Sequence, residues 1–551
     1  MFGYKKGNLF FMMLLVSYTL WLNHLTGQPI KAEANTTHHT TAGSAGHNQK
    51  FSQEPVRLTD VIHTSNSISE KLFHQVKVND QLVEKYQDTQ QINMDSDYSS
   101  LAGVTCFRGN NYRDTASYGI ADMHKGQLRV VWSRPIGRLG EWTGVGWNGQ
   151  PAIVQWDDEW KNKMNISPAK KQREGLKEVI YATLDGNVYF LDLEDGEYTR
   201  PVIKIPGPVK GSVSVDPRGL PLLYVGQGID SYNGRRVEMG YRIFSLLDQH
   251  PLFFLPGYDP FAYRNWGAFD STALVDSKTD TMLLGGENGI LYKVKLNSFY
   301  NEQINQITVK PDIIRYRYKV VDKGNHQGIE NSVVIYKNYA YFADNGGVLQ
   351  CVDTNQMKPV WARDVTDDTD STLVLEEEEP QRVFLYTACE VDLQGNTGKS
   401  YLRKFDALSG EPQWEKQYKC YLNTHTNGGA LATPVLGKQD IANLVIYNLA
   451  RCGTPNGGLL VALDKDSGEE VWKLNLPNYC WSSPVAVYAP NGEGFLVVCD
   501  SVGRMYFIKG KTGQIFHYIS LGANIEGSPA VFDNMIVVGT RGQKIYGVCI
   551  D

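Results

Sequence analysis

Short apolar runs alternate with turn residues through most of the chain. In one recurring unit, two apolar segments flank a turn that contains Gly or Asn. Short apolar runs bounded by such residues are typical of buried strands, and Gly supplies the positive φ that tight hairpin turns require. The pattern therefore predicts β-hairpins over four segments: 179–190, 282–292, 340–349 and 536–546.

A second unit lies downstream of the first and has the form x-Asp-x-x-x-Gly-x-x-x-Trp. Full copies occupy 404–414 and 462–472, and weaker copies occupy 191–196, 352–361 and 508–513. Each copy predicts a strand, a turn opened by Asp and closed by Gly, and a second strand that carries an aromatic residue.

A small polar residue, often followed by Pro, opens each larger repeat. The openings run from position 150 to position 528, which gives an average separation of 54 residues over seven intervals. This period suits four-stranded propeller blades with loop insertions. The eight openings are Gln150, Ser212, Ser271, Ser332, Ser371, Thr433, Ser483 and Ser528.

The last repeat is too short for four strands, and a spare strand occurs near the other end of the repeat region. Residues 128–132 resemble an outer strand that ends in Trp132. Pairing of this strand with the last blade would close the ring and leave no open sheet edge. The sequence therefore predicts an all-β fold, an eight-bladed β-propeller of four-stranded blades closed by an N-terminal strand.

The N-terminal region has the features of an export signal. Lys5 and Lys6 precede an apolar run from Leu9 to Leu22, and a small-x-small site follows at residues 32–34. We expect residues 1–34 to be a cleaved signal peptide or an uncleaved anchor, so the chain is exported and either secreted or membrane-anchored. Membrane contact is then expected only through this segment. Residues 35–100 are expected to be a weakly ordered linker with one short helix near 69–86, before a propeller over 101–551.

Composition and cysteine spacing argue against some classes of function. The 551 residues include 54 basic and 60 acidic side chains, a net charge of −6, which argues against nucleic acid as a partner. None of the eight cysteines has the C-x-x-C spacing of a zinc or thioredoxin-type site. We interpret most of them as small buried strand residues and expect at most one or two disulfides.

The Asp-Gly-Trp repeats resemble those of the pyrroloquinoline-quinone-type β-propellers. That family includes quinoprotein alcohol dehydrogenases and non-enzymatic relatives, among them a lipoprotein that assists outer-membrane protein assembly. The resemblance implies that the repeat tryptophans pack between blades as structural residues; they are Trp132, Trp361, Trp414 and Trp472.

The resemblance also implies which residues a dehydrogenase of this family carries around its cofactor. Such dehydrogenases carry adjacent cysteines over the quinone, a Ca²⁺ site built from Glu and Asn beside a catalytic Asp, and a stacking Trp. No Cys-Cys pair occurs here. Trp147, Trp266 and Trp481 match the stacking residue by type only. The lipid-bearing Cys of the assembly lipoprotein is also absent, and the non-enzymatic branch is favoured.

The starts of the inner strands predict the candidate site, because they share one mouth of the central channel. Four of these eight starts carry a carboxylate and one carries a lysine, so they can hold a cation or a cationic ligand. The alternative is that these side chains cap turns, or that Arg108 and Arg113 neutralise them. We expect no catalytic residue; the predicted binding residues are Asp270, Glu330, Asp370, Asn427, Glu526, Trp147 and Trp481.

Three functions remain open at this point. The favoured one is a non-catalytic binding or scaffold protein of the cell envelope or cell surface, which contacts an envelope protein or a surface ligand. The second is a quinoprotein dehydrogenase that uses pyrroloquinoline quinone and calcium as cofactors. The third is a carbohydrate-binding propeller that uses Trp and Tyr.

Overall fold

The computed structural model describes residues 56–57, 67–123, 125–147, 149–423 and 426–551. The predicted signal peptide or anchor over 1–34 lies outside these residues. Among the residues described, no helix is long and apolar enough to cross a membrane.

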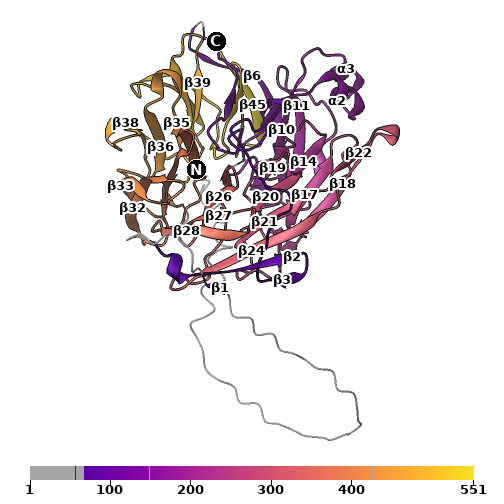
Figure 1. The fold of residues 1–551 in the computed structure, drawn as a ribbon. Coiled ribbons are helices and arrows are strands. Elements are labelled where there is room, and N and C mark those ends of the chain that lie inside the picture. Colours follow the sequence, from indigo (N-terminus) through magenta and orange to yellow (C-terminus); the bar gives the residue numbers. More distant parts are fainter. Residues whose placement is uncertain (1–55, 58–66, 124, 148, 424–425) are drawn as a thin grey trace, which may run out of the picture.

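Eight antiparallel sheets surround a common centre, as the repeat count predicts (Figure 1). The strands of the first four blades, from the inside outward, are β9 (Ala152–Gln155), β10 (Lys177–Ala182), β11 (Asn187–Asp192) and β12 (Ile203–Lys204); β13 (Ser214–Val215), β14 (Leu222–Val225), β17 (Gly240–Ser245) and β18 (Pro251–Pro256); β19 (Leu274–Asp276), β20 (Thr281–Gly285), β21 (Ile290–Lys295) and β24 (Asp312–Val320); and β25 (Val334–Tyr336), β26 (Tyr339–Ala343), β27 (Val348–Asp353) and β28 (Lys358–Asp364).

The next four blades follow the same plan. Their strands are β29 (Val374–Glu379), β30 (Arg382–Ala388), β32 (Thr397–Asp406) and β33 (Pro412–Tyr421); β35 (Val435–Leu436), β36 (Leu444–Ala450), β37 (Gly458–Asp464) and β38 (Glu470–Leu476); β39 (Val485–Tyr488), β40 (Gly494–Cys499), β41 (Arg504–Lys509) and β42 (Ile515–Ser520); and β43 (Ala530–Phe532), β44 (Met535–Thr540), β45 (Lys544–Ile550) and β6 (Leu128–Pro135).

Strand β6 closes the ring. It pairs antiparallel with β45, and Trp132 lies opposite Gly547. The predicted closure of the last blade by a strand from the N-terminal side is confirmed, so the first and last blades share no open edge.

In the described part of the chain, additional strands, two short helices and three 3-10 turns lie outside the four-stranded blades. They are β1 (Val56–Arg57), β2 (Leu72–Val78), β3 (Gln81–Val83), β4 (Ala102–Val104), β5 (Ser117–Tyr118), β7 (Arg138–Leu139), β8 (Trp142–Thr143), β15 (Ser231–Tyr232), β16 (Arg235–Arg236), β22 (Phe299–Asn301), β23 (Gln306–Thr308), β31 (Glu390–Val391), β34 (Gly428–Gly429), α2 (Asp158–Lys163), α3 (Pro168–Lys171), η2 (Ser69–Lys71), η3 (Glu302–Ile304) and η4 (Gln439–Ile441).

The segment expected to be a weakly ordered linker differs from that expectation after residue 67. Strand β2 pairs with the outer strand β24 along its whole length, and the expected helix near 69–86 is only the short turn η2. Four of the seven residues of β2 are buried, namely Leu72, His74, Gln75 and Val76. Asp88 then forms buried ion pairs with Lys293 and Lys295 of β21. The segment extends the third blade outward.

The repeat tryptophans pack against the turn of the following blade. Trp361 in the fourth blade donates its indole N–H to the carbonyl of Ala407, and its ring lies against Gly410 in the fifth. A Cβ at Gly410 would lie 2.6 Å from the ring. The same pairing joins Trp132 to Gly196, Trp414 to Gly468, and Trp472 to Gly513.

The small polar residues that open the blades form a belt of hydrogen bonds between neighbours. The hydroxyl of Ser332 accepts a bond from the Thr272 N–H, and the Ser332 N–H donates to the hydroxyl of Thr372. Ser483 repeats this arrangement between Thr433 and Ser528. The recurring Ser and Thr positions thus tie each inner strand to the next one.

Candidate functional site

The segment from β4 to β5 lies inside the ring of inner strands. Its residues form hydrogen bonds with all eight blades, through strand pairing with β9 and β43, and through contacts with Val215, Thr272, Ile335, Leu375, Pro434 and Pro484. The segment therefore fills the channel along the inner strands. The starts of the inner strands lie beyond it and form the candidate mouth of the channel.

Arg108 and Arg113 do not neutralise the acidic strand starts. Both side chains are buried. Arg108 donates to the carbonyls of Pro434 and Pro484, and Arg113 donates to those of Thr272, Val333 and Phe107. The hypothesis that these arginines pair with the acid ring is wrong, because the hydrogen bonds of their side chains go to backbone carbonyls and, for Arg113, also to the Cys106 sulfur.

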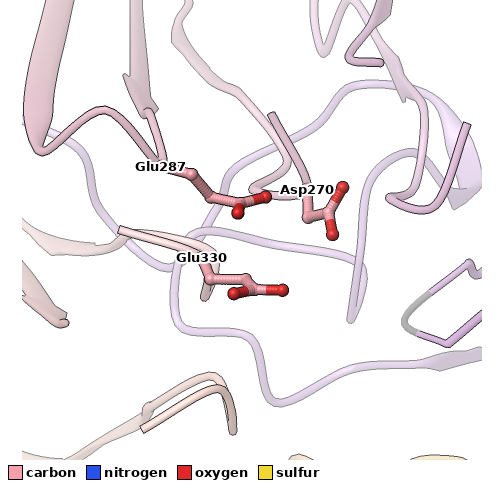
Figure 2. Close-up of side chains that lie close together, drawn as sticks. All are labelled: Asp270, Glu287 and Glu330. Carbon is pink, nitrogen blue, oxygen red and sulfur yellow. The ribbon is translucent and has the colours of Figure 1, made fainter. Parts of the chain in front are cut away.

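Three carboxylates converge on one side of the mouth, and we call them the first triad. They are Asp270 before β19, Glu287 in the turn after β20, and Glu330 before β25 (Figure 2). One oxygen of each lies within 4.8 Å of the others. Lys210 forms ion pairs with Asp270 and Glu330, so the first triad is partly neutralised.

Asp368, Asp370 and Glu390 form a second triad with the same spacing. Asn345 connects the two triads, because its amide donates to Glu330 at 3.1 Å and to both oxygens of Asp368 at 3.2 Å. No ion pair of the residues described in the structure reaches this second triad. Its charge is therefore less compensated than that of the first.

Burial and mutual repulsion set the protonation of both triads. In the first, burial raises the pKa of Asp270 to about 6. Burial also raises the pKa of Glu287, and the charges of Glu330 and Asp270 raise it further. Burial would raise the pKa of Glu330 too, but the ammonium of Lys210 and the amide of Asn345 lower it.

Among the described residues no cation pairs with the second triad, and the Asn345 amide lowers only the pKa of Asp368. Burial raises the pKa of Asp368, Asp370 and Glu390 well above the usual range, and neighbouring carboxylates add to the increase. Carboxylates held this close favour a shared proton or a bound cation.

Glu390 is the member of the second triad with both carboxylate oxygens unsatisfied. It is fully buried, and neither carboxylate oxygen accepts a hydrogen bond of normal geometry from any residue in the described ranges. Burial raises the pKa of Glu390 more than Asp370 and Asn427, which lie within bonding reach, lower it. A buried carboxylate without donors is costly unless a proton or a cation compensates it. Carboxylate and amide oxygens are the ligands that hard divalent cations such as Ca²⁺ prefer.

The remaining predicted residues lie elsewhere in the mouth. Glu526 accepts a bond from Asn524 and lies 3.9 Å from the guanidinium of Arg541. Trp147 and Trp481 belong to an apolar cluster with Leu431, Ala450 and Tyr479. Trp147 is only 8% exposed, so its ring has little free surface for stacking. The structure brings together Asp270 and Glu330, and separately Asp370 and Asn427.

The strand-start rule missed two triad members, Glu287 and Glu390. Both follow the second strand of a blade, as does Asn345. Because that strand is antiparallel to the inner one, its end lies at the same face as the inner strand's start. In the sequence, the Gly-rich turn 285–289 indicates that Glu287 lies where the second strand of the blade ends. Trp266, a stacking candidate by type, donates its indole N–H to Glu287 at 2.8 Å.

In sequence, the matches to known proteins cover part of this chain. Residues 456–550 match the family model described as outer membrane protein assembly factor BamB. Over 86 residues the chain is 26% identical to the human beta-alanine-activating enzyme, which covers 15% of this chain and only 8% of that enzyme. The resemblance to pyrroloquinoline-quinone-like propellers is confirmed.

A solved quinohemoprotein structure shows the same fold. A quinohemoprotein alcohol dehydrogenase from Pseudomonas putida HK5 superposes with a TM-score of 0.56 at 12% identity, covering 84% of this chain and 82% of that one. BamB from Moraxella catarrhalis gives a TM-score of 0.43 at 14% identity, covering 77% of this chain and 97% of that one. At 12% identity the likeness to the dehydrogenase is one of fold alone.

Proposed function

We propose that this propeller is an exported, non-catalytic binding or scaffold protein whose channel mouth holds a hard divalent cation at the second triad. The observation that carries the proposal is the pair of linked triads, six carboxylates that face Lys210 as their paired cation. Arg264 donates to the Asn345 side-chain carbonyl between the triads, and Glu390 is buried with no hydrogen bond of normal geometry to its carboxylate. Calcium is the cation that best suits a set of carboxylate and amide oxygens.

The location and partner rest on other observations. The apolar run near the N-terminus supports export, and the match of residues 456–550 to an outer-membrane assembly factor supports a place in the cell envelope. The broad loop faces of a rigid propeller suit an envelope protein or a surface ligand as partner. Detection of the full chain in the cytoplasm alone, after cell fractionation, would contradict this part.

The mouth residues do not fit a quinone. No adjacent cysteines occur in the sequence, and the acidic mouth would repel an anionic quinone. Lys210, which could attract an anion, is paired with Asp270 and Glu330. We therefore derive no dehydrogenase step. A sugar-stacking role has little support, because Trp147 is buried against the Trp481 cluster.

Titration calorimetry with CaCl₂ tests the cation site. We expect the unmodified protein to bind one Ca²⁺ and Glu390→Gln to lose at least tenfold in affinity, because the substitution removes one of the three carboxylates of the second triad and keeps the side-chain shape. Glu287→Gln is the matched control, since it removes the same charge from the first triad. Equal affinities in all three proteins, or no binding heat in any of them, would refute the proposal.

A further inference from the structure

Two of the eight cysteines face each other across the seam between the fifth and sixth blades. Cys420 lies in the outer strand β33, and Cys452 follows β36. They are partners in an isolated antiparallel bridge, and the two thiols share a hydrogen bond. Cys420 belongs to the fifth blade and Cys452 to the sixth, so a covalent bond here would connect the two blades.

The backbone pattern places this pair at a non-hydrogen-bonded position. The N–H of Tyr421 donates to the carbonyl of Arg451, one residue beyond the pair on each strand. In antiparallel pairing, such a bond flanks a position where the Cα atoms are about 4.5 Å apart and the side chains are close. Disulfides need Cα atoms about 4.4–6.8 Å apart. The backbone therefore needs no rearrangement to form the bond.

The same seam carries part of the cation site. Strand β34 pairs with β31 on one side and with β36 on the other, so Gly429 lies opposite both Glu390 and Ala450. Asn427 immediately precedes β34. A covalent link between Cys420 and Cys452 would hold this local sheet in place at its edge.

The two thiols differ in chemistry. Cys420 is fully buried, whereas Cys452 is 6% exposed. Hydrogen bonding from the Cys420 thiol lowers the pKa of Cys452, with a further contribution from the N–H of Gly453. Since the thiolate is the attacking species in disulfide exchange, Cys452 is the natural nucleophile of the pair.

We propose that Cys420 and Cys452 form an intramolecular disulfide that staples the fifth blade to the sixth. The oxidant is a protein or small-molecule disulfide. The Cys452 thiolate attacks one of its sulfurs, forms a mixed disulfide and releases one thiolate. Cys420 then loses its proton and attacks the Cys452 sulfur, which forms the new bond and releases the second thiolate. Two thiols lose two electrons and two protons, and the external disulfide becomes two thiols.

Cys389 is the competing partner, because it also lies near Cys420. Its sulfur accepts a hydrogen bond from the N–H of Tyr401 at 3.4 Å, which fixes it within the fifth blade. Cys420 lies opposite Gly398 on β32, not opposite Cys389. The strand register therefore favours the link across the blades over the link within one blade.

Peptide mapping of the full chain tests the proposal. The protein is refolded with a mixture of reduced and oxidised glutathione, its free thiols are alkylated under denaturing conditions, and the non-reduced digest is analysed by mass spectrometry. We expect six of the eight cysteines to be alkylated and one linked peptide pair to contain Cys420 and Cys452. Full alkylation of all eight, or a link between Cys420 and Cys389, would overturn the proposal.

Two variants separate the link from general effects on folding. Cys452→Ser removes one partner, and Cys549→Ser replaces a cysteine on β45 that faces Arg129 and Met535. Reduction is expected to lower the urea midpoint of the unmodified protein and of Cys549→Ser, and to leave that of Cys452→Ser unchanged. An equal effect of reduction on Cys452→Ser would contradict the assignment even if that variant is less stable overall.

Discussion

The contact between Trp361 and Gly410 predicts a strong coupling between two neighbouring blades. Gly410 has a φ of +72°, and a Cβ there would lie 2.6 Å from the Trp361 ring, which is fully buried. Gly410→Ala therefore has two costs. The left-handed backbone costs about 1–2 kcal/mol for a residue with a Cβ, and the clash in a packed site costs about 1–3 kcal/mol. Together we expect a loss of about 2–5 kcal/mol.

Removal of the ring separates these two terms. Trp361→Ala alone should cost about 3–5 kcal/mol, as for other buried aromatic truncations. In the double variant the space is open, so Gly410→Ala should cost only the backbone term. The double-mutant cycle then gives a coupling of about 1–3 kcal/mol, which is the clash term.

Urea unfolding followed by far-ultraviolet circular dichroism measures all four proteins without relying on tryptophan fluorescence. Gly234→Ala is the matched control, since Gly234 has a φ of +71° and a Cβ there would have no atom within 4 Å. If Gly410→Ala costs no more than Gly234→Ala, or if the cycle is additive within about 0.5 kcal/mol, the proposed blade contact is refuted.

Three further predictions concern other parts of the molecule. Burial lowers the pKa of His74 from 6.5 to about 4, so the folded protein holds this side chain neutral. The free energy of unfolding should therefore fall by about 3 kcal/mol as the pH drops from 6.5 to 4. Urea midpoints of His74→Phe should lack this pH dependence. Arg113→Met leaves three buried carbonyls without their donor and should lower the free energy of unfolding in urea by at least about 3 kcal/mol. Arg138 is exposed, so Arg138→Met should lower it little. Lys210→Met frees the first triad, and calorimetry should then detect about two calcium ions in place of one.

The repeat count was predictable because each repeat signal has a local physical role. The opening Ser and Thr residues form the hydrogen-bond belt, as Ser332 and Ser483 show. The Gly of the Asp-Gly-Trp unit must lack a Cβ to receive the preceding blade's indole, as at Gly410. Such constraints recur at fixed spacing, so the sequence alone revealed them.

Long-range contacts were not predictable in the same way. Strand β2 carries polar residues such as His74, Gln75 and Lys77, so it did not stand out as a strand in the sequence. Its partner β24 lies more than 200 residues away in the chain. The carbonyls that engage Arg108 and Arg113 belong to the backbone, which carries no residue-specific signal. The sequence therefore suggested acidic partners for these arginines, and the fold provided carbonyls.

The acidic mouth was predictable only in outline. The rule that inner-strand starts share one face identified Asp270, Glu330 and Asp370. It could not show which turns after the second strand bring Glu287 and Glu390 beside them, because that depends on how neighbouring blades pack. The division into two triads, joined by Asn345, is a property of the fold.

Anomalous diffraction from crystals grown with CaCl₂ tests the cation site most directly. The predicted result is an anomalous difference peak coordinated by Asp368, Asp370 and Glu390, which disappears in crystals of Glu390→Gln. An ordered mouth without any such peak, in crystals that contain millimolar calcium, would contradict the claim that this propeller binds a divalent cation at its channel mouth.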